Sequence, residues 1–346
     1  MDRTLIVAPS WVGDAILAES LVSFLREPCE DPTVDILAPP WCAPVFHRVR
    51  GVRRVVDNPI GHGRLDLAGR RAIAAGLRAE GYARAFVLPM SWKSALVPFL
   101  ARIPRRIGFR GEARFGLLND IRRLDEKALP RLVDRFCSLA VPAGSLAPTP
   151  PAPVLVPDLR NRDAAIRALR LGGAGPVAIL CPGAEYGPAK RWPPTHFADL
   201  ARRFQAEGAR VWIVGSPKDK LAADAVMSAA GAPGKAIRDL TGRTDLGTAI
   251  DLLSAASVVV SNDSGLMHAA AAVGVPVVAL FGSSSPVYTP PLSDQARVAR
   301  IDIDCSPCFK RECPLGHFRC MRGLPPELVY NLARAPLAAG ATRPIP

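Results

Sequence analysis

Asp14 is the first residue of the chain whose type and position could do chemistry. It follows Gly13, where the apolar run of residues 5–7 gives way to apolar residues at helical spacing from Ile16 onward. A carboxylate at a helix N-terminus stabilises the helix by ~0.3–1 kcal/mol, so Asp14 could be only a cap. The same position is where open α/β sheets bind ligands, beyond the carboxyl ends of their strands. Asp14 is therefore a candidate for a capping role or a functional one.

A second candidate site lies in the segment SVVVSNDSGLMHAAAA, where polar residues separate an apolar strand from a helix. Free N–H groups and the helix dipole at such a turn can bind a phosphate, and Gly265 lets the backbone approach it. Asp263 would repel a phosphate, so we expect it to face sugar hydroxyls, which favours a nucleotide-sugar site. The alternative is an ordinary cap at Asp263 or Ser264, with His268 a plain helix residue.

The segment CPGAEYGPAKRWPPTHF also follows a predicted strand. Its glycines, including Gly183, predict a loop, and Lys190 and Arg191 bring positive charge to it. A flexible ammonium group suits a diphosphate leaving group, whose negative charge grows as the bond breaks. We therefore expect this loop and the SNDSG turn to line one anion site.

A cysteine cluster occupies the segment CSPCFKRECPLGHFRC near the C-terminus. Its cysteines offer four thiolates for a tetrahedral zinc ion, and His317 is an alternative ligand. The second pair lacks the tight C-x-x-C spacing, so reduced structural thiols are the other interpretation. The candidate ligands are Cys305, Cys308, Cys313 and Cys320.

The chain lacks the sequence motifs of several enzyme classes. It contains no GxxxxGK[ST] loop, no GxGxxG fingerprint and no GxSxG elbow. P-loop, dinucleotide-binding and serine-hydrolase functions therefore have little support.

Strand and helix patterns alternate along both halves of the chain. Strands are predicted in TLIVAP, TVDILAP, RRVVDN and RAFVLP, and again in PVAILCPGA, RVWIVGS, SVVVSND and VPVVALFG. This alternation indicates α/β units with parallel sheets. The segment at residues 141–157 is rich in proline and reads as a linker. We predict two Rossmann-like domains, at residues 1–150 and 151–325, facing a central cleft, with a tail at residues 326–346 that packs back on the N-terminal domain.

The formal net charge of +13 suggests an anionic partner. Basic residues occur in both halves of the chain, so nucleic acid, anionic lipid and phosphorylated small molecules are all compatible with it. No aromatic residues interleave a basic motif as in nucleic-acid binders, and we expect no nucleic-acid partner.

No stretch reaches the ~20 apolar residues of a membrane span, and we find no export signal at the N-terminus. The expected location is therefore cytoplasmic, where the cysteines would be reduced.

Four motifs in order carry a resemblance to a known family: PSWVGDAILAESL, PGAEYGPAKRWP, the segment from DLTGRTD to VVALFG, and CSPCFKRECPLGH. Together they strongly resemble the heptosyltransferases of glycosyltransferase family 9, from about residue 3 to residue 330. The resemblance implies the GT-B fold, which is built from two Rossmann-like domains. It also implies transfer of L-glycero-D-manno-heptose from ADP-heptose to the first heptose of the lipopolysaccharide inner core, without a cofactor.

The resemblance implies a role for several residues. Asp14 matches the family's general base, which removes a proton from the acceptor hydroxyl in an inverting displacement. Lys190 matches the lysine that contacts the donor diphosphate. The N-terminal domain would bind the acceptor and the C-terminal domain the donor. The donor-binding residues expected on this basis are Gly183, Ser216, Asp219, Asp263, Ser264, Gly265 and His268.

A basic cluster from Lys93 to Arg114 gains meaning from the same resemblance. It would bind the phosphates of the acceptor and the carboxylates of its Kdo sugars, chiefly through Lys93, Arg105, Arg106 and Arg110. The acceptor, heptosyl-Kdo2-lipid A, is a membrane lipid. We therefore expect a peripheral association with the cytoplasmic face of the inner membrane.

Three alternatives stay open on the sequence. A heptosyltransferase I-type or other family 9 enzyme would use another acceptor, although the SWVGD form and the cysteine cluster favour the type that adds the second heptose. A sugar-nucleotide 2-epimerase would release free sugar. A non-enzymatic nucleic-acid binder would show steeply salt-dependent affinity.

Overall fold

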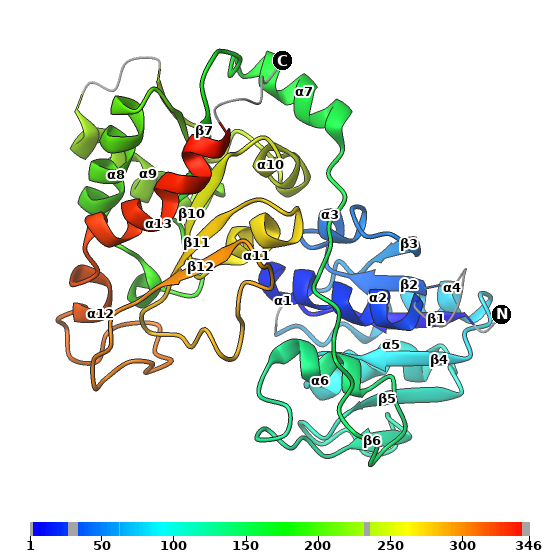
Figure 1. The fold of residues 1–346 in the computed structure, drawn as a ribbon. Coiled ribbons are helices and arrows are strands. Elements are labelled where there is room, and N and C mark those ends of the chain that lie inside the picture. The colour runs from blue at the N-terminus through cyan, green and yellow to red at the C-terminus, as the bar shows by residue number, and fades with distance from the viewer. Residues whose placement is uncertain (1–2, 27–33, 62, 232–235, 341–346) are drawn as a thin grey trace. The chain divides into compact units, whose positions relative to one another are not determined.

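The computed structural model describes residues 3–26, 34–61, 63–231 and 236–340 (Figure 1). The chain divides into two compact units, residues 1–155 and 156–346. The division falls inside the proline-rich segment that we interpreted as a linker. None of the described helices combines the length and the apolar character that crossing a membrane requires.

The N-terminal unit is built around a parallel sheet. In its described residues the sheet has six strands in the order β3-β2-β1-β4-β5-β6. The strands are β1 Thr4–Val7, β2 Val34–Ala38, β3 Val52–Asp57, β4 Arg84–Val87, β5 Arg105–Phe109 and β6 Asp120–Arg122. The helical segments are α1 Val12–Leu17, α2 Glu19–Arg26, α3 Ala43–Phe46, α4 Leu67–Arg78, η1 Trp92–Ala95, α5 Leu96–Leu100 and α6 Leu132–Ser138. Strands β1 and β2 are buried throughout, as parallel strands covered on both faces should be.

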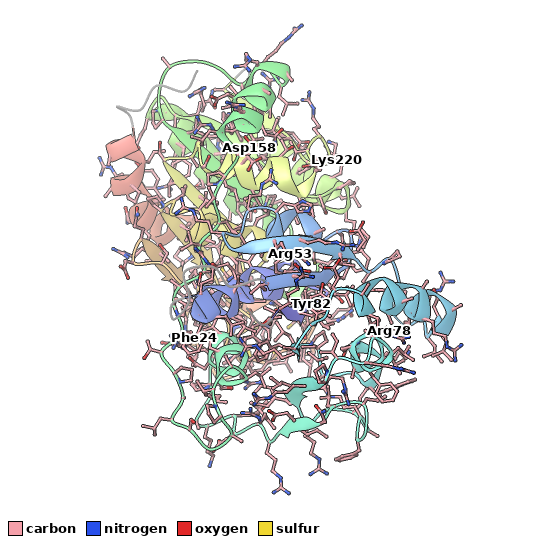
Figure 2. The ribbon with its side chains drawn as sticks, turned by 90° about the vertical axis from the view of Figure 1, so that its right-hand side faces the viewer. Phe24, Arg53, Arg78, Tyr82, Asp158 and Lys220 are labelled. Atoms are coloured by element: carbon pink, nitrogen blue, oxygen red, sulfur yellow. The ribbon has the colours of Figure 1, made fainter. Side chains whose placement is uncertain are left out.

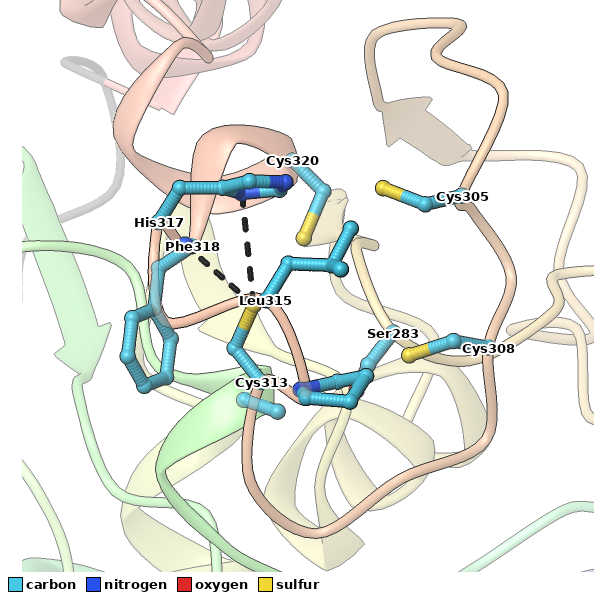
Figure 3. A pocket seen from close by; sticks show the side chains of 10 residues that line it. Ser283, Cys305, Cys308, Cys313, Leu315, His317, Phe318 and Cys320 are labelled. Atoms are coloured by element: carbon cyan, nitrogen blue, oxygen red, sulfur yellow. Dashed lines mark hydrogen bonds between the residues drawn. The ribbon is translucent and has the colours of Figure 1, made fainter.

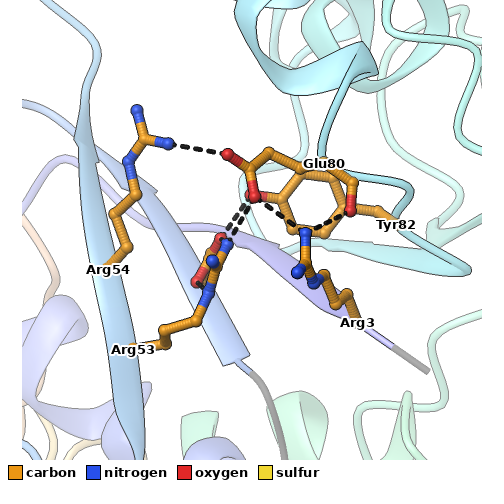
Figure 4. A network of polar contacts seen from close by, with 6 residues as sticks. Arg3, Arg53, Arg54, Glu80 and Tyr82 are labelled. Atoms are coloured by element: carbon orange, nitrogen blue, oxygen red, sulfur yellow. Dashed lines mark hydrogen bonds and ion pairs between the residues drawn. The ribbon is translucent and has the colours of Figure 1, made fainter. Parts of the chain in front are cut away.

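A polar network joins the amino ends of these strands (Figure 4). Asp35 of β2 is fully buried, accepts a hydrogen bond from the Tyr82 hydroxyl, and forms an ion pair with Arg53 of β3. Glu80 accepts further bonds from Arg3, Arg53 and Arg54. Figure 2 marks Arg53 and Tyr82 within this part of the unit. These charges therefore stabilise the sheet at the edge opposite to Asp14.

The C-terminal unit repeats the same topology. In its described residues six parallel strands lie in the order β12-β11-β10-β7-β8-β9. The strands are β7 Val177–Cys181, β8 Arg210–Ile213, β9 Ile237–Asp239, β10 Val258–Asn262, β11 Val277–Leu280 and β12 Ala296–Ala299. The helical segments are α7 Leu159–Ala168, η2 Pro188–Lys190, α8 Pro194–Ala206, η3 Pro217–Asp219, α9 Lys220–Ala230, α10 Leu246–Leu253, α11 Gly265–Ala272, α12 Arg319–Arg322 and α13 Pro326–Ala339.

The C-terminal helix differs from our expectation. We predicted that residues 326–346 pack back on the N-terminal domain. Instead, Val329, Ala333 and Leu337 of α13 are buried in the core of the C-terminal unit, where α13 contacts α8, β10 and β11. An apolar stripe at this spacing fits any complementary surface, so the sequence could not identify its partner. Residues 341–346 lie outside the described part of the chain.

Each sheet has one point where the strand order reverses, between β1 and β4 and between β7 and β10. Ligands of doubly wound α/β proteins bind beyond the carboxyl ends of the strands at this point. The predicted residues Asp14, Gly183 and Asp263 all follow such strand ends.

Candidate functional site

An ion pair forms the centre of the candidate site in the C-terminal unit. Asp263 directly follows β10, and Lys190 ends η2 in the loop after β7. Lys190 Nζ lies 2.5 Å from Asp263 Oδ2, and the Ser284 hydroxyl donates to the same oxygen at 2.5 Å. The fold thus joins two motifs 73 residues apart. We expected Asp263 to face sugar hydroxyls, whereas here it neutralises Lys190.

His268 lies one turn into α11 and is only 5% exposed. Burial lowers its pKa to about 4; the nearby charge of Asp263 opposes this shift and that of Lys190 adds to it. The imidazole is therefore neutral at pH 7. Its Nδ1 atom is buried and has no hydrogen-bond partner among the described residues. Buried polar atoms are almost always paired, so this nitrogen is an exception that a bound water molecule would satisfy.

The N-terminus of α11 is not an ordinary capped helix end. Ser264 is the N-cap residue, yet its side chain makes no capping hydrogen bond within the described structure. Its hydroxyl instead lies 3.2 Å from the hydroxyl of Ser261. Gly265 is the first residue of the helix. The capping alternative therefore does not explain this turn, and its N–H groups can bind an anion.

Asn262 connects the loop that carries Lys190 to the end of β10. Its amide donates to the Pro182 carbonyl at 2.7 Å and accepts from the Trp192 backbone N–H at 3.0 Å. Because Asn262 is fully buried, these bonds fix both ends of the loop. Sequence reasoning placed Asn262 in the turn and gave it no role. A polar amide side chain at the end of an apolar strand was the sequence feature that could have indicated this role.

Gly183, Ser216 and Asp219 meet at the carboxyl ends of β7 and β8. A Cβ atom on Gly183 would lie 2.2 Å from the Asp219 carboxyl carbon, so a larger residue there would displace this carboxylate. Asp219 accepts from the Ser216 backbone N–H at 2.9 Å and from its hydroxyl at 2.8 Å. The two polar side chains form a capping box around η3. The structure therefore brings these three predicted residues together, with the Ser216 and Asp219 side chains bonded to each other.

Asp14 lies in the first turn of α1 in the N-terminal unit and is half-buried. Its backbone carbonyl accepts from Ala18 N–H at 2.9 Å. Burial and, second, the negative charge of Asp14 raise the pKa of the Cys42 thiol to about 12. The N-cap of α1 is Trp11, so Asp14 is inside the helix and is not its cap.

A pocket opens at the carboxyl ends of β1, β2 and β4 in the same unit. Lys93 reaches into its wall and donates to the Gly63 carbonyl at 2.9 Å. Trp41 is 45% exposed there, and its indole N–H donates to Ser10 O at 2.8 Å. The polar and aromatic residues of the lining are Ser10, Trp41, Asn58, Arg64, Arg70, Ser91, Lys93 and Ser94. We did not predict Trp41, Asn58 or Arg64, although Asn58 ends a predicted strand and the other two follow the ends of predicted strands.

The structure separates the predicted basic cluster. Arg105 and Arg106 begin β5, at the amino edge of the sheet, whereas Lys93 lies at the carboxyl edge. Arg105 pairs with Asp120 at 2.9 Å, and the Arg106 guanidinium donates to two backbone carbonyls. Arg110 follows β5 and lies 5.8 Å from the centre of the Phe115 ring. Arg105 and Arg106 therefore do not share an edge of the sheet with Lys93, because closeness in sequence does not decide which end of a strand a residue occupies.

The cysteine cluster lines one cavity of the C-terminal unit, with Leu315 and His317 (Figure 3). Cys313 Sγ accepts from Phe318 N–H at 3.4 Å, and this and other backbone N–H groups lower the pKa of the thiol. All four predicted cysteines, Cys305, Cys308, Cys313 and Cys320, line it. However, no group of three or more histidine, cysteine or acidic side chains in the described ranges is arranged to hold a metal ion. The geometry does not support the predicted zinc site.

Comparison with known proteins places this geometry in a family. The family model described as glycosyltransferase family 9 (heptosyltransferase) matches residues 70–319. Lipopolysaccharide heptosyltransferase 2 of Escherichia coli K12 is 42% identical, over 95% of this chain and 97% of that protein. Lipooligosaccharide heptosyltransferase 2 of Haemophilus influenzae is 41% identical, over 86% and 88%.

A solved structure supports the same assignment. The structure of E. coli ADP-heptose lps heptosyltransferase II matches with a TM-score of 0.87 at 39% identity, over 97% of this chain and 99% of that one. The fold is therefore the α/β GT-B fold that the resemblance implied. The chain belongs to glycosyltransferase family 9, the heptosyltransferases.

Proposed function

We propose that this glycosyltransferase moves L-glycero-D-manno-heptose from ADP-heptose to the first heptose of the lipopolysaccharide inner core. The relatives that are about 40% identical over nearly the whole chain are heptosyltransferases of this second type. The observation that carries the donor assignment is the Lys190–Asp263 ion pair beside the N-terminus of α11, where the N-cap side chain makes no capping hydrogen bond in the described structure.

The donor diphosphate would bind at the N-terminus of α11. The N–H groups near Ser264 and Gly265 and the ammonium of Lys190 supply positive charge there. As the glycosidic bond breaks, negative charge grows on the ADP, and Lys190 would stabilise it more in the transition state than in the ground state. Lys190 would then turn from Asp263 to the phosphate, which leaves the Asp263 carboxylate to accept hydrogen bonds from heptose hydroxyls. Gly183, Ser216 and Asp219 would line the nucleoside end.

The displacement would invert the configuration at the anomeric carbon. Asp14 would act as general base and remove the proton of the acceptor hydroxyl as it attacks C1 from the face opposite to ADP. One carboxylate suffices, because the leaving diphosphate needs charge stabilisation and no protonation. No further cofactor is needed for this step. The proposal requires that the two units act on one bound pair of substrates.

The acceptor would bind in the N-terminal unit, at the pocket beyond β1, β2 and β4. Arg64 and Lys93 give this pocket positive charge, and Arg110 follows β5 at the same edge of the sheet. Such a pocket suits the carboxylates of Kdo sugars and the phosphates of lipid A. Because the acceptor is a lipid, we propose a peripheral association with the cytoplasmic face of the inner membrane.

Incubation of the protein with ADP-heptose and heptosyl-Kdo2-lipid A, followed by mass spectrometry of the glycolipid, tests this function. We expect the glycolipid to gain the mass of one heptose residue. Transfer only to an acceptor that lacks heptose would indicate a heptosyltransferase I-type enzyme. Release of free sugar without transfer would indicate an epimerase. Either outcome would overturn the proposal.

A further inference from the structure

Lys190 is held on two sides. Asp263 pairs with its ammonium group, and the Tyr186 ring centre lies 4.9 Å from Nζ. A lysine at this distance from an aromatic face is attracted by the ring electrons. Because the lysine stem is long and flexible, a second contact restricts the positions that Nζ can adopt.

Tyr186 is itself held by the cysteine-rich segment, residues 305–320. Its hydroxyl donates to the Phe309 carbonyl at 2.7 Å, and the guanidinium of Arg311 lies 5.4 Å from the ring centre. Two cations and one hydrogen bond therefore fix the plane of the ring. Tyr186 is half-buried, so solvent screens these contacts only in part.

The backbone of the same loop is docked on the same segment. Ala189 N–H donates to the Arg311 carbonyl at 3.0 Å. Gly187 approaches this carbonyl so closely that a Cβ atom would lie 2.4 Å from its oxygen. The position of the loop from Tyr186 to Lys190 therefore depends on the position of the cysteine-rich segment.

The segment also contacts the loop that supports Asp263. Phe309 N–H donates to Ser283 O at 2.7 Å, next to Ser284, whose hydroxyl bonds Asp263. The Ser306 hydroxyl donates to the Gly282 carbonyl at 2.7 Å. One segment therefore joins both loops of the Lys190–Asp263 pair.

We propose that Tyr186 is a positioning residue, which the cysteine-rich segment holds so that it directs Lys190 toward the donor diphosphate. This inference rests on the proposed role of Lys190. In this proposal Tyr186 acts through the lysine. The cysteine-rich segment thereby gains a function in catalysis that requires no metal ion.

A double-mutant cycle tests this proposal. Tyr186→Leu should lower kcat/KM for ADP-heptose about tenfold, with an unchanged thermal midpoint. Tyr186→Phe keeps the ring face and should stay within about threefold of the wild type. In a Lys190→Met background, Tyr186→Leu should cause no further loss, because its effect requires the ammonium group. A merely structural role would lower activity equally in both backgrounds, and that result would overturn the proposal.

Tyr330→Leu is the matched control. The contacts of Tyr330 resemble those of Tyr186. Its hydroxyl donates to the Glu207 carboxylate, and the Arg203 guanidinium lies 5.5 Å from the centre of its ring. Tyr330 belongs to α13 and not to the loop that carries Lys190. The Tyr330→Leu variant should leave kcat/KM for ADP-heptose unchanged. If Lys190→Met alone leaves the kinetics unchanged, the proposed function of Lys190 fails. If Lys190→Met is impaired and the losses of kcat/KM from Lys190→Met and Tyr186→Leu add in the double variant, only the positioning role of Tyr186 fails.

Discussion

The two units share one strand order but differ at the edge where ligands are expected. In the C-terminal unit the side chains at the carboxyl ends of the strands bind one another, as Lys190 binds Asp263 and Ser216 binds Asp219. In the N-terminal unit the same edge holds a pocket with an exposed Trp41 and with Lys93 on a backbone carbonyl. On the proposed function, the network of charged side chains would bind the small anionic donor and the pocket the large glycolipid. The same topology would then serve two kinds of recognition.

The largest expected effect is that of a substitution at Asp14 in the N-terminal unit. We expect Asp14→Asn to lower kcat about 10³-fold, because an amide cannot accept the acceptor proton. Affinity for ADP-heptose, measured by titration calorimetry, should change less than about threefold. Asp66→Asn is the control, since Asp66 caps α4 in the same unit through Gly69 N–H. Near-normal turnover of Asp14→Asn would remove this residue from the role of base.

In the C-terminal unit, we expect a substitution at Lys190 to lower activity most. We expect Lys190→Met to lower kcat/KM for ADP-heptose about 10²-fold, as loss of one transition-state charge partner does. Lys218→Met is the matched control, because Lys218 forms an exposed pair with Glu185. Steady-state kinetics with varied donor measure the effect. Equal kinetics for the two variants would contradict a contact of Lys190 with the diphosphate.

His268 gives the C-terminal unit a dependence on pH. Its folded-state pKa of about 4 lies below the usual 6.5, so between these values the unfolded chain binds a proton that the folded chain does not. Stability therefore rises with pH in this window. From pH 8 to pH 5 this group should cost about 2 kcal/mol, or about 30-fold in the folding equilibrium.

Urea unfolding at both pH values measures this cost. His268→Gln should lose that part of the pH dependence, whereas His47→Gln, at an exposed position of the N-terminal unit, should keep it. Burial also lowers the pKa of His196, which contributes equally in all three proteins. An identical pH dependence in His268→Gln would show that this histidine is not held neutral.

The smallest expected effects test whether the N-terminal pocket binds the glycolipid acceptor. Lys93→Met and Arg64→Met should each raise KM for the glycolipid about fivefold to tenfold and leave KM for ADP-heptose unchanged. Arg105→Met is the matched control, because Arg105 lies at the opposite edge and pairs with Asp120. A rise in acceptor KM for Arg105→Met equal to that for Lys93→Met would contradict the separation of the basic cluster.

Local patterns predicted much of this fold. Apolar strands alternating with helical spacing indicated both parallel sheets, and the rule that ligands bind at strand ends selected Asp14 and Asp263. The sequence also selected Lys190 as a candidate. It could not predict the ion pair with Asp263, because that contact depends on how β7 and β10 lie side by side.

Other features depend on tertiary contacts that local sequence does not encode. Which edge of the sheet Arg105 occupies depends on where β5 begins. The partner of α13 depends on a surface made by α8 and the sheet. Four cysteines at suggestive spacing line one cavity, but the backbone between them does not arrange their sulfur atoms for a metal ion.

A crystal structure with ADP-heptose bound tests the central claim most directly. The account predicts that Lys190 Nζ lies within hydrogen-bond distance of a diphosphate oxygen, that the diphosphate contacts the N-terminus of α11, and that Asp263 accepts from a heptose hydroxyl. A donor bound elsewhere, with Lys190 still paired only to Asp263, would contradict it.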